Sequence, residues 1–233
     1  SDLNATETHI AYEHILDDHS RLLLEFYYKR YRNFPMDPAQ PSLFIIDEAI
    51  YRDFYYPHHS LISSGKALAY GFEIAYQKQL SKKLHSYIGL TWFRTRYQDL
   101  LGEWQNRIFD GRIKFIFDIG YQIDRNWHFS MKYSIAGGIP DSPYDLAASE
   151  ALGSGVLHPD RINRNRLDPI DTLNLRIDWK VFFSGSSLSL YFSVWNLFDK
   201  QSDIGYLWTE YGNYHNSHIR IGFLPILGMK YDF

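Results

Sequence analysis

The feature that most constrains this chain is a strict alternation of apolar and polar side chains over long segments. From Leu173 to Phe183 every second residue is large and apolar, and polar or charged residues fill the positions between them up to Lys180. Successive side chains of a strand point to opposite faces of a sheet, so this pattern predicts a strand with one apolar and one polar face. The same pattern recurs in 113–123 and 68–77, whereas helical spacing is hard to find.

Weaker alternation brings the expected number of strands to about nine. The further segments lie around residues 10–16, 22–29, 87–97, 129–136, 188–194 and 219–233. For 10–16 and 87–97 the sequence does not decide which side chains share the apolar face. Each segment is long enough to cross a bilayer at a tilt, which takes about 9–11 residues.

Short and long connections alternate along the chain. Short polar turns are expected at 17–20, 80–83, 124–126 and 184–187, and long connections at 33–64, 98–110, 137–169 and 198–217. Several long loops count against a compact soluble domain, whose connections are mostly short. Tight turns on one rim and long loops on the other are typical of outer-membrane barrels.

Composition supports the membrane interpretation and excludes several others. Lys+Arg 24 against Asp+Glu 27 gives a net charge of −3, which offers no electrostatic reason for a nucleic-acid partner. Cysteine is absent, so disulfides and thiol chemistry are excluded. Aromatic residues make up 18%, and Tyr and Trp recur near the ends of the apolar rows, as at a membrane interface. The rival is a soluble β-sandwich, which would bury Phe72, Phe117 and Trp179 between two sheets.

Four segments carry motifs that can be compared with known families. They are Gly65–Glu73, Gly138–Tyr144, Val194–Lys200 and Leu224–Gly228 followed by the final Phe233. In this order they resemble a glycine-punctuated strand, a later loop, the end of the penultimate strand and the closing strand of TonB-dependent outer-membrane receptors, in the style of Bacteroidetes receptors. Phe233 with Tyr231 before it also resembles the C-terminal signal by which bacterial outer-membrane proteins are recognised for membrane insertion.

The resemblance implies a fold and a place within a larger protein. Residues 1–233 would form the C-terminal portion of a single all-β domain, an antiparallel up-and-down transmembrane β-barrel of about 22 strands. About nine strands lie in this sequence, and the plug domain, the TonB-binding segment and the N-terminal strands do not. An open sheet cannot sit in lipid, because its edge N–H and C=O groups would lack partners.

The resemblance also implies a function. Such receptors import a scarce, large solute (a siderophore, cobalamin, glycan or peptide) across the outer membrane of a Gram-negative bacterium, powered by TonB. The implied partners are outer-membrane lipid, the protein's own plug domain, TonB and a surface lipoprotein. The alternative is a barrel scaffold or subunit of a larger membrane assembly without TonB-driven uptake.

Two groups of residues are candidates for binding. Aromatic rings in the last long loop could stack on a flat ligand, or they could extend the interfacial aromatic belt or pack loop on loop: Tyr206, Trp208, Tyr211 and Tyr214. Polar-row residues are expected to face the lumen and contact the plug or line a substrate path: Glu73, Arg112, Lys114, Asp118, Arg176, Asp178 and Lys180.

No catalytic or metal site is expected. The spacing of the ten histidines matches no zinc pattern. Asp17-Asp18-His19 lies in an expected short turn, and Gly153-Ser154-Gly155 lacks the context of a nucleophile elbow. The sequence therefore predicts a protein that is not an enzyme and that needs no cofactor.

Overall fold

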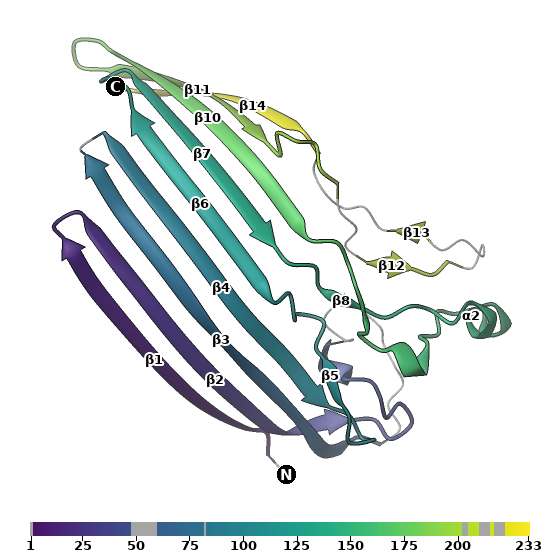
Figure 1. The fold of residues 1–233 in the computed structure, drawn as a ribbon. Helices are drawn as coiled ribbons and strands as arrows, with labels where there is room; N and C mark the ends of the chain where they lie inside the picture. The colour runs from purple at the N-terminus through teal and green to yellow at the C-terminus, as the bar shows by residue number, and fades with distance from the viewer. Residues whose placement is uncertain (1, 48–59, 82, 202–204, 210–214, 217–221) are drawn as a thin grey trace.

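The computed structural model describes residues 2–47, 60–81, 83–201, 205–209, 215–216 and 222–233. Nine long strands of the described residues form one curved antiparallel sheet in chain order (Figure 1). They are β1 (Asn4–Asp17), β2 (Ser20–Met36), β3 (Ile62–Ser81), β4 (Leu84–Gln98), β6 (Ile113–Gln122), β7 (Trp127–Ala136), β10 (Ile170–Phe182), β11 (Ser187–Trp195) and β14 (Leu224–Asp232). The short β5 (Trp104–Asn106) pairs with β4. The predicted all-β, up-and-down arrangement is confirmed.

The two faces of this sheet differ as the alternation predicts. In the register, Leu24 lies opposite Ile74, which lies opposite Leu90, which lies opposite Phe115, so the apolar rows of four strands form one continuous surface, here called the apolar face. The charged rows form the opposite, polar face. Phe72 is 39% and Trp179 37% exposed. A second sheet packed on the apolar face would bury these rings, so the sandwich alternative is excluded.

Aromatic rings border the apolar face at both ends. Toward one end Tyr28 stacks on Tyr70, with ring centroids 6.4 Å apart, and Tyr70 lies 6.0 Å from Trp92. Toward the other end Trp127 stacks on Trp179 at 5.9 Å. Amphipathic rings in two rows around an apolar band are the pattern of a membrane-spanning barrel wall.

All short turns lie at one rim of the sheet and all long connections at the other (Figure 1). The long-loop rim carries small elements: α2 (Leu146–Leu152), the 3₁₀ turn Pro159–Arg161, and two hairpins made by β8 (Pro140–Asp141) with β9 (Asn165–Arg166) and by β12 (Tyr206–Leu207) with β13 (His215–Asn216). Asp145 caps α2 by accepting the Ala148 N–H, and Gly153 ends it in the left-handed conformation. No helix of the described residues is long and apolar enough to cross a membrane.

Several predicted boundaries were wrong at the long-loop rim. The connection expected from Asn33 to Ser64 is shorter, because β2 runs on to Met36 and β3 starts at Ile62. Asn33 takes a left-handed φ of 65° and the register shifts beside it, which hid the continuation from a period-two pattern. The last strand was expected from Ile219, but β14 begins at Leu224, and residues 217–221 lie outside the described part.

The sheet is open. Within the described residues β1 pairs only with β2, and β14 only with β11. Both edge strands therefore present a row of unpaired backbone groups.

Candidate functional site

Most of the buried residues among those described lie at the long-loop rim. A first cluster joins the ends of β2, β3 and β4 to the β2–β3 connection: Phe34, Met36, Phe44, Ala67 and Tyr97. The Phe44 ring lies 5.1 Å from Phe34 and 4.9 Å from Tyr97. The Tyr97 hydroxyl donates to the Ser42 carbonyl at 2.6 Å. The part of the connection around Ser42 and Phe44 thus packs against the strand ends.

Changing Tyr97 to Phe is expected to loosen this contact. The substitution removes the hydrogen bond to Ser42 but keeps the ring, so it leaves one carbonyl without its donor and costs about 1–3 kcal/mol. Amide hydrogen exchange over 41–47 in the full-length protein should accelerate. Tyr121→Phe, at an exposed ring near the short-turn rim, is the control and should change nothing; equal exchange in the two variants would contradict the assignment.

A buried ion pair joins the β2–β3 connection to the β4–β6 connection. Asp47, 1% exposed, accepts from Arg107 Nε at 3.0 Å and from its terminal nitrogen at 2.5 Å. The Arg107 guanidinium also lies 5.0 Å from the Phe44 ring centroid. Bidentate pairs of this kind fix orientation as well as position, so these two connections move together.

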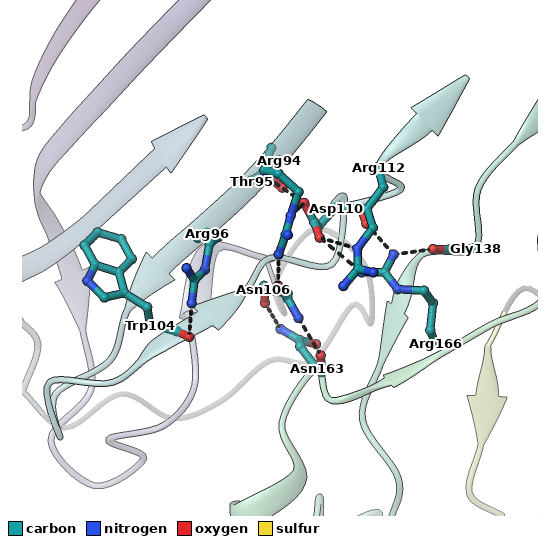
Figure 2. A network of polar contacts seen from close by, with 10 residues as sticks. All are labelled: Arg94, Thr95, Arg96, Trp104, Asn106, Asp110, Arg112, Gly138, Asn163 and Arg166. Atoms are coloured by element: carbon teal, nitrogen blue, oxygen red, sulfur yellow. Dashed lines mark hydrogen bonds and ion pairs between the residues drawn. The ribbon is translucent and has the colours of Figure 1, made fainter. Parts of the chain in front are cut away.

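Asp110 is the centre of a second network (Figure 2). Its carboxylate is fully buried and contacts three arginines: Arg94 Nε at 3.2 Å, Arg166 at 3.1 Å and Arg112 Nε at 3.7 Å. It also accepts the Thr95 backbone N–H at 2.8 Å. This N–H belongs to β4 beyond the point where β6 begins, so Asp110 takes the place of the missing ladder partner.

Arg166 carries the β7–β10 connection into the same network. One guanidinium nitrogen donates to the carbonyls of Asp110 at 2.5 Å and Gly138 at 2.6 Å. Burial lowers the pKa of Arg166, and the hydrogen bond that Arg166 donates to Asp110 acts in the opposite direction and raises it. Arginine stays charged in proteins, so three cations surround one carboxylate and the cluster holds a net positive charge.

Hydrogen bonds between two asparagines, Asn106 and Asn163, also connect these loops. Asn163 donates from its side chain to the Asn106 carbonyl at 2.8 Å (Figure 2). Ser142 donates to the Asn163 side-chain oxygen at 3.1 Å. Asn163 takes a left-handed φ of 53°, which asparagine tolerates better than most residues. Three long connections are therefore cross-linked into one folded layer.

A mainly apolar cavity of about 400 Å³ opens in this layer. It lies between the β2–β3 and β7–β10 connections, and Leu43, Val156, Leu157 and Ile162 contribute apolar side chains to its lining. A second buried cluster adjoins it, made of Leu43, Tyr144, Leu157 and Ile162, with Trp208 packed against it. Concave apolar sites of this size are where small ligands bind in proteins.

The predicted loop aromatics are only partly described. Trp208 is half-buried against the second cluster, which fits loop-on-loop packing beside the cavity. Tyr206 lies in β12, which pairs with β13. Tyr211 and Tyr214 lie outside the described residues. A role of these rings in ligand binding stays a prediction.

Six of the seven residues predicted to face the lumen lie in strands, on the polar face. They are Glu73, Lys114, Asp118, Arg176, Asp178 and Lys180. Register places Lys114 opposite Thr91, which lies opposite Glu73, and Asp178 opposite His128. Arg112 differs: it precedes β6, takes a left-handed φ of 66° and joins the Asp110 network instead of the strand row.

Polar-face side chains pair both within a strand and between neighbouring strands. Arg176 Nε donates to Asp178 at 2.9 Å, and its guanidinium lies 3.9 Å from the Tyr191 ring centroid. A Cβ on Gly228 would come within 2.2 Å of that ring, so the ring occupies the space that a side chain there would need. On β1 and β2, Lys29 pairs with Glu7 at 2.8 Å. No group of three metal-binding side chains occurs among the described residues.

Comparison of whole structures identifies known proteins that share this fold. The chain resembles the ferric-catecholate import receptor Fiu from *E. coli* K12, with a TM-score of 0.65 at 13% identity over 99% of this chain and 27% of that one. The chain has the barrel fold of TonB-dependent outer-membrane receptors. The ferripyoverdine receptor of the *Pseudomonas aeruginosa* outer membrane gives 0.61 at 14%, over 98% and 27%, and the copper transporter OprC 0.62 at 12%, over 99% and 31%.

These likenesses cover almost all of this chain but only part of the others. The chain spans 27% of the first two structures and 31% of the third. No protein-family model and no curated protein sequence matches it. The apolar–polar alternation and the motifs predicted this fold, although the overall sequence identity to the similar structures is low.

Proposed function

We propose that this chain is the C-terminal part of the barrel of a TonB-dependent outer-membrane transporter. The observation that carries the proposal is the two-faced sheet: nine long strands expose an aromatic-bordered apolar face on one side and a charged face on the other. Exposing that apolar face to water would cost free energy, and so would exposing the charged face to lipid. A barrel wall between bilayer and aqueous lumen satisfies both faces.

The location that follows is the outer membrane of a Gram-negative bacterium. In a bilayer every backbone N–H and C=O must be paired, so the free edges of β1 and β14 need further strands that close the barrel. The structural likeness to receptors much longer than this chain supports such strands. Phe233 and Tyr231 would serve as the signal for insertion, and the Bacteroidetes-like style of the motifs stays a prediction.

The partners follow from the enclosed polar face. Its charged rows would contact the protein's own plug domain, which TonB would displace to open a path. A surface lipoprotein would accompany a transporter of glycans or peptides. In this arrangement the barrel holds its shape while the plug moves.

The solute is a scarce, large compound such as a siderophore, cobalamin, glycan or peptide. The neighbours named above are a ferric-catecholate receptor, a ferripyoverdine receptor and a copper transporter, and their range does not single out one solute. The loop-layer cavity and the aromatics Tyr206, Trp208, Tyr211 and Tyr214 would form part of the extracellular mouth that meets it.

The test uses the full-length gene in its own host. We expect the protein in the outer-membrane fraction, and we expect its deletion to abolish uptake of one solute class. Inactivating TonB should abolish the same uptake. A protein that remains in the outer membrane and whose solute uptake does not respond to TonB would instead support the barrel-scaffold alternative.

A further inference from the structure

Four cations lie on the apolar face between the aromatic row of Tyr28, Tyr70 and Trp92 and the long-loop rim. They are Arg30, Arg32, Lys66 and Arg96, here called the basic patch. Register places Arg30 opposite Leu68, which lies opposite Arg96, and Arg32 opposite Lys66. Tyr28 and Tyr70 lie opposite each other in the register. The cations are two to four residues further along the strands, closer to the long-loop rim.

The charge of the basic patch is not balanced within the described residues. None of the four side chains makes an ion pair there. Arg30 and Arg32 are exposed, and the neighbouring β1 residues across from them are the neutral Thr6 and Asn4. Lys66 donates only to the Gln98 side chain, at 3.2 Å.

Arg96 is held in place and keeps an unsatisfied donor. One terminal nitrogen donates to the Trp104 carbonyl at 2.8 Å, and the guanidinium lies 6.0 Å from the Trp104 ring centroid (Figure 2). Its Nε is buried and has no hydrogen-bond partner. The bond to Trp104 therefore fixes the Arg96 guanidinium at this end of β4, and no carboxylate of the described residues balances its charge.

The basic patch differs from three other charges on or near these strands, each of which has an ion-pair partner. Arg94, two residues from Arg96, is paired with Asp110, a carboxylate that it shares with Arg112 and Arg166. On the polar face of β2, Lys29 is paired with Glu7. Near the long-loop end of β10, Asp171 on the apolar face pairs with Lys200. Among the described residues, the basic patch is therefore a group of four cations on β2, β3 and β4 that have no ion-pair partner.

We propose that the basic patch binds the phosphate groups of lipid headgroups in the outer leaflet. The inference rests on the membrane position proposed above. Aromatic rows mark the level of the headgroups, and cations directly beyond them meet the phosphates. Arginine offers a planar fork that matches two phosphate oxygens, and each cation near an anionic surface strengthens binding about fivefold.

The test measures lipid binding by the full-length protein. Native mass spectrometry in a zwitterionic detergent would follow titration with diphosphorylated lipid A. Arg30→Gln with Arg32→Gln should weaken binding about twenty-five-fold. The matched control, Lys78→Gln with Arg125→Gln, removes the same charge near the short-turn rim and should bind as the wild type does. The single variant Lys66→Gln, expected to lose about fivefold, serves if the double variant does not fold.

Two outcomes would overturn the inference. One is wild-type affinity in both patch variants, and the other is equal binding of lipid A from which both phosphates have been removed. A full-length protein that stays dispersed in buffer without detergent would instead overturn the membrane position itself. Insertion into bilayers without preference for phosphorylated lipid leaves the proposed function standing and defeats only this inference.

Discussion

Replacing Phe117 with arginine is expected to prevent stable assembly of the barrel. Phe117 lies in the middle of β6 on the apolar face, opposite Ile88 on β4 and Tyr133 on β7. An arginine facing lipid near mid-depth costs about 2–4 kcal/mol, and the substitution also gives up the contacts of the ring. The measurement is the folded fraction of the full-length protein in lipid vesicles during urea titration.

The residue before it gives a matched control. Ile116 lies at almost the same depth but on the polar face, opposite Gly89 and Ser134. Ile116→Arg introduces the same charge into the same strand, and we expect it to fold nearly as the wild type does. If Ile116→Arg failed to assemble and Phe117→Arg did not, the two faces would have been assigned the wrong way round.

Strand positions were readable from the sequence because alternation is a local property. A strand needs only its own period of two to show its faces, so 113–123 and 173–183 predicted β6 and β10 to within a few residues. Register settled the segments whose facing was ambiguous: Leu90 lies opposite Ile74, which fixes the apolar row of β4. Where β2 passes the irregular Asn33, the local pattern breaks and the prediction stopped too early.

The folded loop layer could not be predicted in the same way. Its main contacts join residues far apart in the chain: Arg107 and Asp47 are separated by 60 positions, and Arg166 and Asp110 by 56. Long loops have no period that would align such pairs. The only signal was the presence of arginines and aspartates in segments expected to be loops. Arg112 was assigned to the polar row of β6 because no local pattern reveals its contact with Asp110, which places it in the loop layer.

The aromatic residues illustrate the same limit. Their abundance predicted an interface, and the rows at Tyr28, Tyr70 and Trp127 confirm the sequence-level expectation that rings border the apolar face. Composition does not say which rings serve a loop core. Phe44, Tyr97 and Trp208 pack in the loop layer because residues from distant connections meet there.

Changing Asp110 to Asn is expected to open the loop layer while the strands stay paired. The amide keeps the shape of the side chain but cannot balance Arg94 and Arg166, whose side chains are only 24% and 26% exposed. Breaking a buried pair from one side costs about 3–5 kcal/mol, and the partial exposure of the arginines places this case near 3. Amide hydrogen exchange should accelerate over 107–112 and 138–144 and stay unchanged in the middles of β6 and β7.

Two further variants separate charge balance from general damage. Asp178→Asn breaks the more exposed pair with Arg176, whose side chains are 28% and 44% exposed, and should cost less than about 1 kcal/mol. Adding Arg166→Gln to Asp110→Asn removes one of the unbalanced cations, so the double variant should exchange more slowly than Asp110→Asn alone. If amide exchange were faster in the double variant than in Asp110→Asn alone, Arg166 would stabilise the layer through its contacts with the carbonyls of Asp110 and Gly138. The buried carboxylate would then not be the group that holds the three connections together.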